Sequence, residues 1–222
     1  MQRRIKSYVL RAGRLSPRQA HGLEKQLVNY VLSLDEQPWD VLQVFGREAE
    51  TILEIGFGMG ASLIIMAEQE PDTNFIGIEV HEAGVGALAA DISEKQISNI
   101  KIAPYDAVMV LEKSIAPESI NGVQIFFPDP WPKKRHHKRR LIQPAFIQML
   151  LRALKPGGFI HCATDWQDYA DHMLTVLSAE PLLKNQYEDF APRPARRPLT
   201  KFEMRGQALG HGVWDLIFLK QG

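Results

Sequence analysis

The sequence predicts an α/β protein with a Rossmann-like, doubly wound and mostly parallel sheet. Short apolar runs alternate with helical patterns between residues 51 and 179, which is typical of successive βαβ units. A glycine-rich turn follows the first of these runs, and acidic residues end the next two. In such sheets ligands bind beyond the carboxyl ends of the strands, so these residues are the first candidates for a binding site.

The composition suits one well-buried core and limits the classes of partner. The 222 residues are 45% hydrophobic, and 26 basic residues balance 26 acidic ones, so only local clustering of charge could favour a nucleic-acid partner. The single cysteine, Cys162, forms no intramolecular disulfide and suits a reducing, cytoplasmic setting. We expect neither a signal peptide nor a membrane span, because no segment approaches about 18 uninterrupted apolar residues.

Residues 1–40 are expected to form a basic arm with short helices ahead of the main domain, which would cover residues 41–222. Ser16 and Pro17 suit the N-cap and the first turn of a helix. The first 23 residues contain no acid, and their cations are Arg3, Arg4, Lys6, Arg11, Arg14 and Arg18.

In the main domain, apolar patterns predict strands and helices in alternation. Residues 155–158 (KPGG) are expected to end a helix and turn into the fifth strand, and the proline-rich segment 191–198 is expected to be a loop. Strands are expected over residues 51–56, 74–80, 100–106, 121–128, 159–164 and 213–220, and helices over 60–69, 82–96, 140–154 and 166–179.

The turn after the first strand carries Gly56, Gly58 and Gly60, which allow a tight turn and close approach of a ligand. Their spacing is Gly-x-Gly-x-Gly, whereas the dinucleotide fingerprint is Gly-x-Gly-x-x-Gly. Glu54 lies just ahead of them, where a carboxylate suits a cationic amino acid or sulfonium better than a pyrophosphate. Taken alone, the turn also fits an ordinary strand-to-helix connection.

Two further acids stand at the next two strand ends. Glu79 follows the glycine turn by about 20 residues, where a carboxylate accepts the hydroxyls of a ribose. Asp106 ends the third strand, where a side-chain oxygen suits an adenine amino group. Each acid alone fits a solvated loop or a helix cap. Together with Glu54 they predict a phosphate-free nucleoside ligand, which S-adenosylmethionine is and NAD is not.

The segment after the fourth strand, residues 127–132 (FPDPWP), is expected to be a rigid, non-helical loop. It places Asp129 at the active end of the sheet and offers Trp131 as a flat face on which a base can stack. The alternative is a tryptophan buried over the sheet edge, with Asp129 as a turn residue.

Six of the eight residues at 133–140 (KKRHHKRR) are Lys or Arg. We expect them at the start of the 140–154 helix, an end that repels cations, so the arrangement favours an anionic partner such as a phosphate backbone. A solvated face is the plainer alternative. Metal binding by His136 and His137 is disfavoured, because adjacent helix residues do not face one site. The N-terminal arm and a group formed by Arg193, Arg196 and Arg197 are further basic clusters.

With these residues assembled, the chain resembles the bacterial tRNA guanine-N7 methyltransferases. The resemblance spans nearly the whole chain. It implies the class I methyltransferase fold, with about seven strands and the last one antiparallel. It also implies metal-free transfer of a methyl group from S-adenosylmethionine to N7 of guanine 46 in the tRNA variable loop. The segments that carry it are EIGFGMG (54–60), GIEV (77–80), FFPDPW (126–131), KKRHHKRR (133–140), ATDW (163–166) and LTKFEMRGQALGHGVWDL (199–216).

The resemblance also implies roles for single residues. Glu54, Glu79, Asp106 and Asp129 resemble cofactor-binding acids, and Asp129 also resembles the catalytic residue. The implied substrate-binding residues are Lys133, Asp165, Thr200, Lys201, Phe202 and Glu203. The implied RNA contacts are Arg135, His136, His137, Lys138, Arg139 and Arg140. The implied partners are tRNA, S-adenosylmethionine and S-adenosylhomocysteine, without a membrane, for a cytoplasmic monomer or homodimer.

Three other functions fit parts of the pattern. A methyltransferase for exocyclic amino groups uses an Asp/Asn-Pro-Pro-aromatic loop at this place, but the second adjacent proline is absent here. A non-catalytic RNA-binding module needs neither the glycine turn nor the strand-end acids. A nicotinamide oxidoreductase needs a turn that accepts pyrophosphate, which Glu54 opposes.

Overall fold

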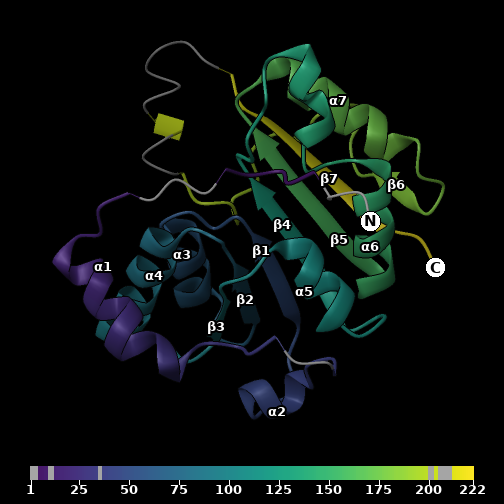
Figure 1. Ribbon diagram of the computed structural model, residues 1–222. Coiled ribbons are helices and arrows are strands. Elements are labelled where there is room, and N and C mark those ends of the chain that lie inside the picture. Colours follow the sequence, from purple (N-terminus) through teal and green to yellow (C-terminus); the bar gives the residue numbers. More distant parts are fainter. Residues whose placement is uncertain (1–4, 10–12, 35–36, 200–202, 205–211) are drawn as a thin grey trace.

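The computed structural model describes residues 5–9, 13–34, 37–199, 203–204 and 212–222, and its centre is a seven-stranded sheet (Figure 1). The strand order is β3-β2-β1-β4-β5-β7-β6. The first five strands run parallel, whereas β7 is antiparallel to both β5 and β6. This confirms the predicted mostly parallel sheet with an antiparallel last strand. The strands are β1 (Thr51–Ile55), β2 (Asn74–Ile78), β3 (Ile100–Ala103), β4 (Ile120–Phe126), β5 (Leu154–Thr164), β6 (Leu183–Asn185) and β7 (Trp214–Lys220).

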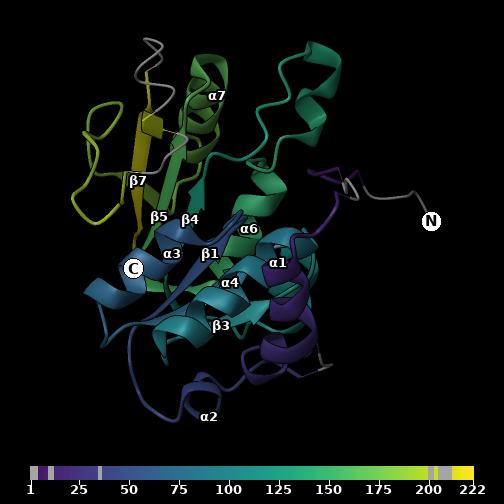
Figure 2. The same cartoon turned by 90° about the vertical axis from the view of Figure 1, so that its left-hand side faces the viewer.

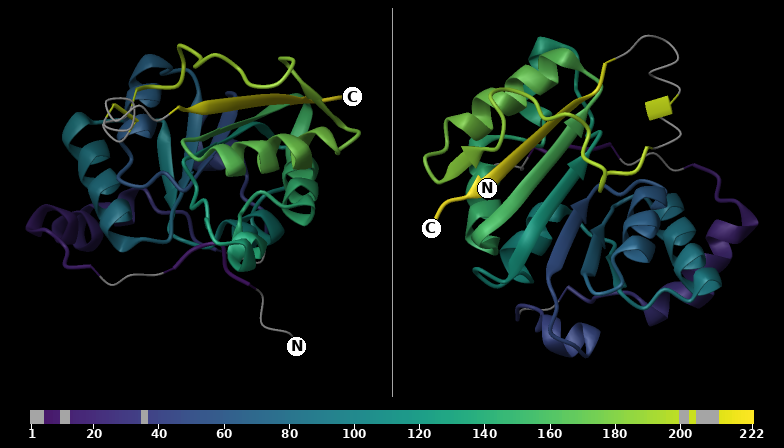
Figure 3. Two further views of the ribbon diagram at one scale, coloured as in Figure 1. Left: turned by 90° about the horizontal axis from the view of Figure 1, so that it is seen from above. Right: turned by 180° about the vertical axis from the view of Figure 1, so that it is seen from behind.

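Helices cover both faces of the sheet (Figure 3). Buried side chains of α3 and α4 pack on one face, and those of α5, α6 and α7 pack on the other. Both faces of the central strands are therefore apolar, as expected for a parallel sheet. The helices are α1 (Pro17–His21), α2 (Val41–Phe45), α3 (Ala61–Gln69), α4 (Glu82–Lys95), α5 (Ala107–Lys113), α6 (Pro144–Ala153) and α7 (Gln167–Ser178). Shorter helical segments are η1 (Gly22–Gln26), η2 (Leu27–Asn29) and η3 (Lys134–Arg139).

Helix α1 and the short segments η1 and η2 pack along the outer side of α4 (Figure 2). Helix α1 begins as predicted, with the Ser16 hydroxyl accepting a hydrogen bond from the Gln19 amide. Gly22 and Gly86 allow a close approach to α4, since a Cβ on Gly22 would lie 2.0 Å from the Gly86 carbonyl oxygen. Val31 then forms an isolated bridge with Ile102 of β3.

Three predictions about elements need correction. The helix expected from residue 140 begins at Pro144, because the basic run forms the separate 3₁₀-helix η3. Residues 155–158 lie within β5 as a bulge, since β4 pairs Ile120 with Leu154 and then Gly122 with Phe159. Helix α5 and the three-residue β6 were not predicted, because such short elements carry too little periodicity. Within the described ranges, no helix is long and apolar enough to cross a bilayer.

Candidate active site

The glycine turn after β1 has the backbone conformation that its sequence predicts. Gly56, Gly58 and Gly60 have φ angles of 78°, 57° and 82°, in the left-handed region that residues with a Cβ rarely adopt. A Cβ on Gly60 would also lie 2.8 Å from Leu88 Cδ1. The turn therefore brings bare backbone to the carboxyl end of β1 before α3 starts.

Glu79 joins this turn to the end of β2. Its Oε2 accepts a hydrogen bond from the Gly58 amide at 3.0 Å, and its Oε1 accepts from the amides of Val80 at 2.6 Å and His81 at 3.0 Å. The residue is buried. Three backbone donors thus orient one carboxylate, which leaves little freedom for it to move when a ligand enters.

Asp106 is the N-cap of α5, three residues beyond the end of β3. Its Oδ1 accepts a hydrogen bond from the Val108 amide at 2.9 Å, and the side chain is half-buried. The cap explains why an acid is compatible with this position without any ligand. It also sets the direction of the side chain at the same sheet edge as Glu79.

One cavity of about 270 Å³ is bordered by residues at the carboxyl ends of the strands. Glu79, Asp106 and Asp129 all line it. No Lys or Arg is among the described residues of its wall, so its charge is anionic and suits a cation without phosphates. The remaining lining residues are Ser7, Tyr8, Ile55, Gly56, Gly58, Ile78, Val80, His81, Tyr105, Ala107, Phe126, Phe127, Pro128 and Leu141.

Glu54 is placed differently from the other three acids. It lies in the middle of the sheet within β1, is 1% exposed and is not part of the cavity wall. Burial raises its pKa to about 7, although the Ser62 hydroxyl donates a hydrogen bond to Oε1 at 2.8 Å. Its Oε2 has no hydrogen-bond partner among the described residues. A buried acceptor without a partner beside an anionic cavity fits a cationic group.

The loop after β4 is held in a strained conformation. Phe127 and Trp131 have φ angles of 52° and 46°, which cost about 1–3 kcal/mol each in non-glycine residues. The Phe127 amide donates to the Ala163 carbonyl of β5, and Trp131 Nε1 donates to the Ser7 carbonyl of the N-terminal arm at 2.9 Å. Neighbouring segments therefore hold the loop, as expected at a functional site.

Asp129 lies at the centre of this loop and is exposed. It lines the 270 Å³ cavity and also a second hollow of about 360 Å³, which it shares with Trp131 and His81. The guanidinium of Arg139 covers the Trp131 ring at 3.9 Å from its centroid, so the ring is not fully available for the expected stacking. The other residues of the second hollow are Val9, Pro130 and Pro132.

Arg140 does not occupy the surface position expected for an RNA contact. It is 3% exposed, its Nε donates to the Pro130 carbonyl at 2.9 Å, and its guanidinium pairs with Asp168 of α7. This hydrogen bond lowers the pKa of Asp168. Arg140 thus ties the end of the Asp129 loop to α7. The exposed members of the basic run are Lys133, Lys134, Arg135 and Lys138, with His136, His137 and Arg139 half-buried.

In each of the two other predicted basic clusters, some cations are paired with acids. Arg196 makes a bidentate pair with Glu70, with hydrogen bonds of 2.7 and 2.6 Å. Arg18 pairs with Asp91 and Glu94 of α4. Arg18 and Arg196 therefore add little free positive charge to these clusters, because acids that are distant in the sequence lie beside them, whereas Lys6, Arg14 and Arg193 are exposed. Arg3, Arg4 and Arg11 lie outside the described residues.

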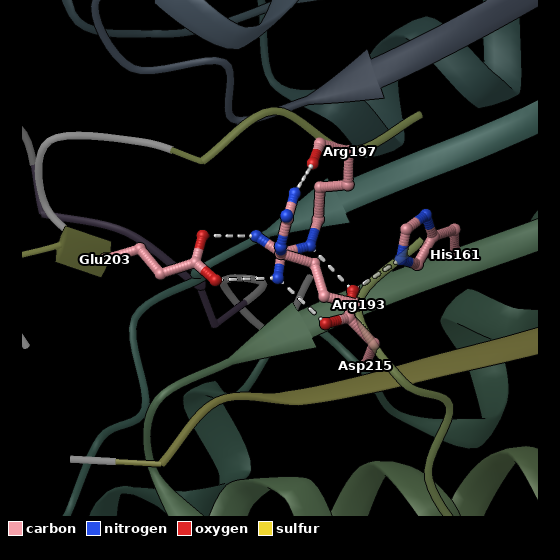
Figure 4. A network of polar contacts seen from close by, with 5 residues as sticks. All are labelled: His161, Arg193, Arg197, Glu203 and Asp215. Atoms are coloured by element: carbon pink, nitrogen blue, oxygen red, sulfur yellow. Dashed lines mark hydrogen bonds and ion pairs between the residues drawn. The ribbon is translucent and has the colours of Figure 1, made fainter. Parts of the chain in front are cut away.

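The predicted substrate-binding residues are scattered over three environments. Lys133 is exposed and Asp165 is half-buried just after β5. Glu203 is 1% exposed and is held by Arg197 (Figure 4). Thr200, Lys201 and Phe202 lie outside the described residues.

Sequence reasoning missed two features of this region. Ser7 and Tyr8 of the arm line the main cavity, but nothing in their pattern distinguishes them. The second is the buried pairing of Arg197 with Glu203 and Asp215, because the sequence pattern assigned Arg197 to a basic cluster. No local pattern indicated this pairing, because Glu203 and Asp215 lie 6 and 18 residues after Arg197.

Comparisons with known proteins agree with the geometry. A family model described as "Putative methyltransferase" matches residues 48–216. The chain is 61% identical over 225 residues to the tRNA (guanine-N(7)-)-methyltransferase of Legionella pneumophila (strain Lens), which covers 100% of both chains. It is 57% identical over 221 residues to the protein of the same name from Paraburkholderia xenovorans (strain LB400), covering 100% of this chain and 85% of that one.

Solved structures show a similar fold at low sequence identity. The 16S rRNA methyltransferase KamB has a TM-score of 0.62 at 14% identity, covering 87% of this chain and 99% of that chain. An rRNA methylase from Streptococcus thermophilus has a TM-score of 0.52 at 13% identity, covering 94% and 100%. These likenesses support the Rossmann-like architecture and nothing more specific.

Proposed function

Because the chain belongs to the tRNA (guanine-N7)-methyltransferase family, we propose that it methylates N7 of guanine 46 in the variable loop of tRNA. The methyl donor is S-adenosylmethionine, and the product S-adenosylhomocysteine leaves. The cytoplasm, where tRNA is processed in bacteria, is the compartment that we propose for the reaction.

One observation carries this proposal: Asp129 lines two adjoining hollows. The first contains Glu79 and Asp106, an anionic wall without Lys or Arg among its described residues. The second is bordered by Trp131 and by prolines, of which Pro132 directly precedes the basic run. A cationic methyl donor in the first hollow and a guanine in the second would meet at Asp129.

The residues present fit the adenosyl group and its cationic tail. Glu79 is oriented by three amides at the end of β2, where a ribose would lie, and Asp106 would take the adenine amino group. Apolar side chains such as Tyr105 and Ile78 line the walls and suit the faces of a purine. Glu54 supplies a buried carboxylate for the positive charge of the amino-acid portion.

Methyl transfer to guanine N7 needs little acid–base chemistry from the protein. N7 carries an in-plane lone pair, so no proton has to be removed before it attacks. The donor supplies an activated sulfonium methyl group. The task of the residues is to hold the two reactants in line, at an approach of about 3–3.5 Å. Asp129 would accept hydrogen bonds from guanine N1–H and the amino group, and would stabilise the positive charge that the purine gains.

The basic run supplies the contacts to the tRNA backbone in this proposal. Lys133, Lys134, Arg135 and Lys138 are exposed, and they follow the Asp129 loop directly. Exposed cations next to the reaction site suit phosphate binding. His136, His137 and Arg139 would take part at the edge of this surface, whereas Arg140 holds the loop from inside. Lys133, Asp165 and the segment 200–202 remain the proposed substrate contacts.

Incubation with labelled S-adenosylmethionine and unmodified tRNA tests the proposal. We expect label in N7-methylguanosine at position 46, identified by mass spectrometry of the digested RNA. A tRNA transcript with adenine at position 46 is the matched control and should remain unlabelled. Label on an exocyclic amino group would identify the rival methyltransferase reaction instead. No labelled nucleoside with intact S-adenosylmethionine binding would contradict the proposed substrate.

A further inference from the structure

A buried ionic network joins β5, β7 and the loop that carries Arg197 (Figure 4). Arg197 Nη1 and Nη2 donate to the two carboxylate oxygens of Glu203 at 2.6 and 2.9 Å. Arg197 Nε and Nη2 donate to Asp215 at 2.7 and 2.8 Å. All three side chains are no more than 2% exposed. One guanidinium therefore bridges two carboxylates that are 12 residues apart in the sequence.

The surroundings of the network fix it to the sheet. His161 of β5 pairs with Asp215 Oδ1 at 2.7 Å, and Arg193 Nη1 donates to the Arg197 carbonyl at 2.8 Å. Burial opposes ionisation of Asp215, but the hydrogen bonds from His161 and Arg197 hold its pKa below the ordinary value. The pKa of His161 is lowered by burial. Arg197 thus pairs with two buried carboxylates at once.

The same guanidinium touches the start of the catalytic loop. Its central carbon lies 5.6 Å from the centroid of the Phe127 ring and 6.0 Å from that of Phe126. Phe127 is one of the two strained residues that flank Asp129 in the loop. Arg197 therefore contacts both the Glu203 segment and the loop that carries Asp129.

Glu203 is poorly placed to recognise a base directly. Both of its oxygens already accept charge-assisted hydrogen bonds, and its side chain is 1% exposed. If Glu203 turned to bind guanine, Arg197 would lose one of its two carboxylate partners while remaining buried. Removing a partner from a buried charge is destabilising. The contact with Arg197 has a simpler consequence, since it holds residues 203–204 against β7.

We propose that Arg197 is a positioning residue of the methyl-transfer site, which anchors Glu203 to β7 and to the base of the Asp129 loop. This inference rests on the proposed tRNA methylation. Glu203 then serves the reaction through Arg197 and makes no hydrogen bond to guanine. The requirement is for arginine, because a lysine ammonium cannot present two bidentate faces to two carboxylates.

A double-mutant cycle tests the coupling. Arg197→Lys keeps the charge and is expected to lower kcat on tRNA about 100-fold through misplacement of the loop. Its Kd for S-adenosylmethionine should stay within about 3-fold of wild type, because the cofactor residues are untouched. Addition of Glu203→Gln should cause little further loss, since both changes break one anchor. Arg196→Lys, at the neighbouring and partly exposed pair with Glu70, is the matched control and should keep near-normal kcat.

Two outcomes of this cycle would overturn the proposal. Near-normal turnover by Arg197→Lys would show that the anchor is not needed. Losses that multiply in the double variant would show that Glu203 acts independently of Arg197. Calorimetric binding of S-adenosylmethionine reports whether each variant is folded. If wild type fails to methylate guanine N7, the proposed function fails and the exchange measurement below still decides the anchor.

Hydrogen–deuterium exchange on the RNA-free protein provides that second measurement. Glu203→Gln preserves the side-chain shape and is expected to raise exchange about 10-fold in peptides with residues 203–204 and with Trp214–Lys220, because charge-assisted hydrogen bonds are lost. Glu70→Gln breaks the neighbouring Arg196 pair and should leave these peptides unchanged. A residue that only recognises guanine would not alter exchange without RNA, so unchanged exchange in Glu203→Gln overturns the anchor.

Discussion

The edge of the sheet that borders the cavities has two halves, which are held together in different ways. One half carries Glu79 and Asp106, and the other carries the Asp129 loop. Beyond the ends of β2 and β3, the carboxylates accept hydrogen bonds from amides of their own or neighbouring turns, as Glu79 does from Gly58 and Asp106 from Val108. On the β4 side, the contacts join segments far apart in the chain, such as Trp131 with Ser7 and Arg140 with Asp168. The first half is organised locally, whereas the second depends on the whole fold.

This difference has a functional consequence. The cofactor half can keep its shape when the substrate loop is altered, because its hydrogen bonds do not cross to that loop. The substrate half should be sensitive to changes in distant segments, since a strained loop needs its neighbours to hold it. Binding of the methyl donor and transfer of the methyl group should therefore be separable by mutation.

Asp129→Ala is expected to give the largest difference between the effect on methyl transfer and the effect on binding of the methyl donor. Removal of this carboxylate should lower kcat for tRNA methylation about 1000-fold, because a stabilising charge and the guanine contacts are lost. The Kd for S-adenosylmethionine, measured by calorimetry, should change little, since Glu79 and Asp106 remain. Asp165→Ala, just after β5, is a useful comparison for the second carboxylate of this half. Near-normal turnover of Asp129→Ala would contradict the assigned role.

The pH dependence of stability should distinguish Glu54 from the other acids. Its pKa is raised to about 7 by burial, so the folded state holds a proton that the unfolded state loses above its ordinary pKa. Wild-type stability without ligand should therefore fall as pH rises from about 4.5 to 7, by about 3 kcal/mol. Glu54→Gln removes this penalty and should be more stable than wild type at pH 8 but not at pH 4.5. Denaturant unfolding at both pH values provides the measurement. If the free energy of unfolding of Glu54→Gln differed from that of wild type by the same amount at both pH values, the raised pKa of Glu54 would be ruled out.

Glu79→Gln should weaken binding of S-adenosylmethionine in the locally organised half without affecting tRNA binding. Loss of a charged acceptor for three amides is expected to raise the Kd for S-adenosylmethionine about 30-fold. The matched control is Glu82→Gln, an exposed acid three residues further along the chain, which should bind normally. Equal weakening of tRNA binding in a filter assay would show that the two halves are coupled.

The smallest effect is expected at the basic run. Arg135→Gln with Lys138→Gln should weaken tRNA binding about 10-fold and reduce its salt slope by about 2. Arg18→Gln removes a cation that is already paired with Asp91 and Glu94, so its salt slope should match wild type. An unchanged slope in the double variant would place the phosphate contacts on another surface.

The sequence by itself determined most of the local half. Left-handed glycines and apolar runs of strand length act within a few residues, so their patterns predicted the turn and the parallel sheet. It also predicted the non-helical loop around Asp129, since prolines do not fit a helix interior. It did not predict the left-handed φ angles of Phe127 and Trp131, because a residue before proline normally has an extended backbone.

Only the tertiary structure decided which charged side chains face solvent. Arg140 and Arg197 belong to sequences that indicate a basic surface, yet both are buried against carboxylates. Glu54 is likewise removed from the cavity wall that its position beside the glycine turn suggested. The physical reason is that burial and pairing of a charge depend on partners brought together by the fold, and the local pattern of residues does not contain those partners.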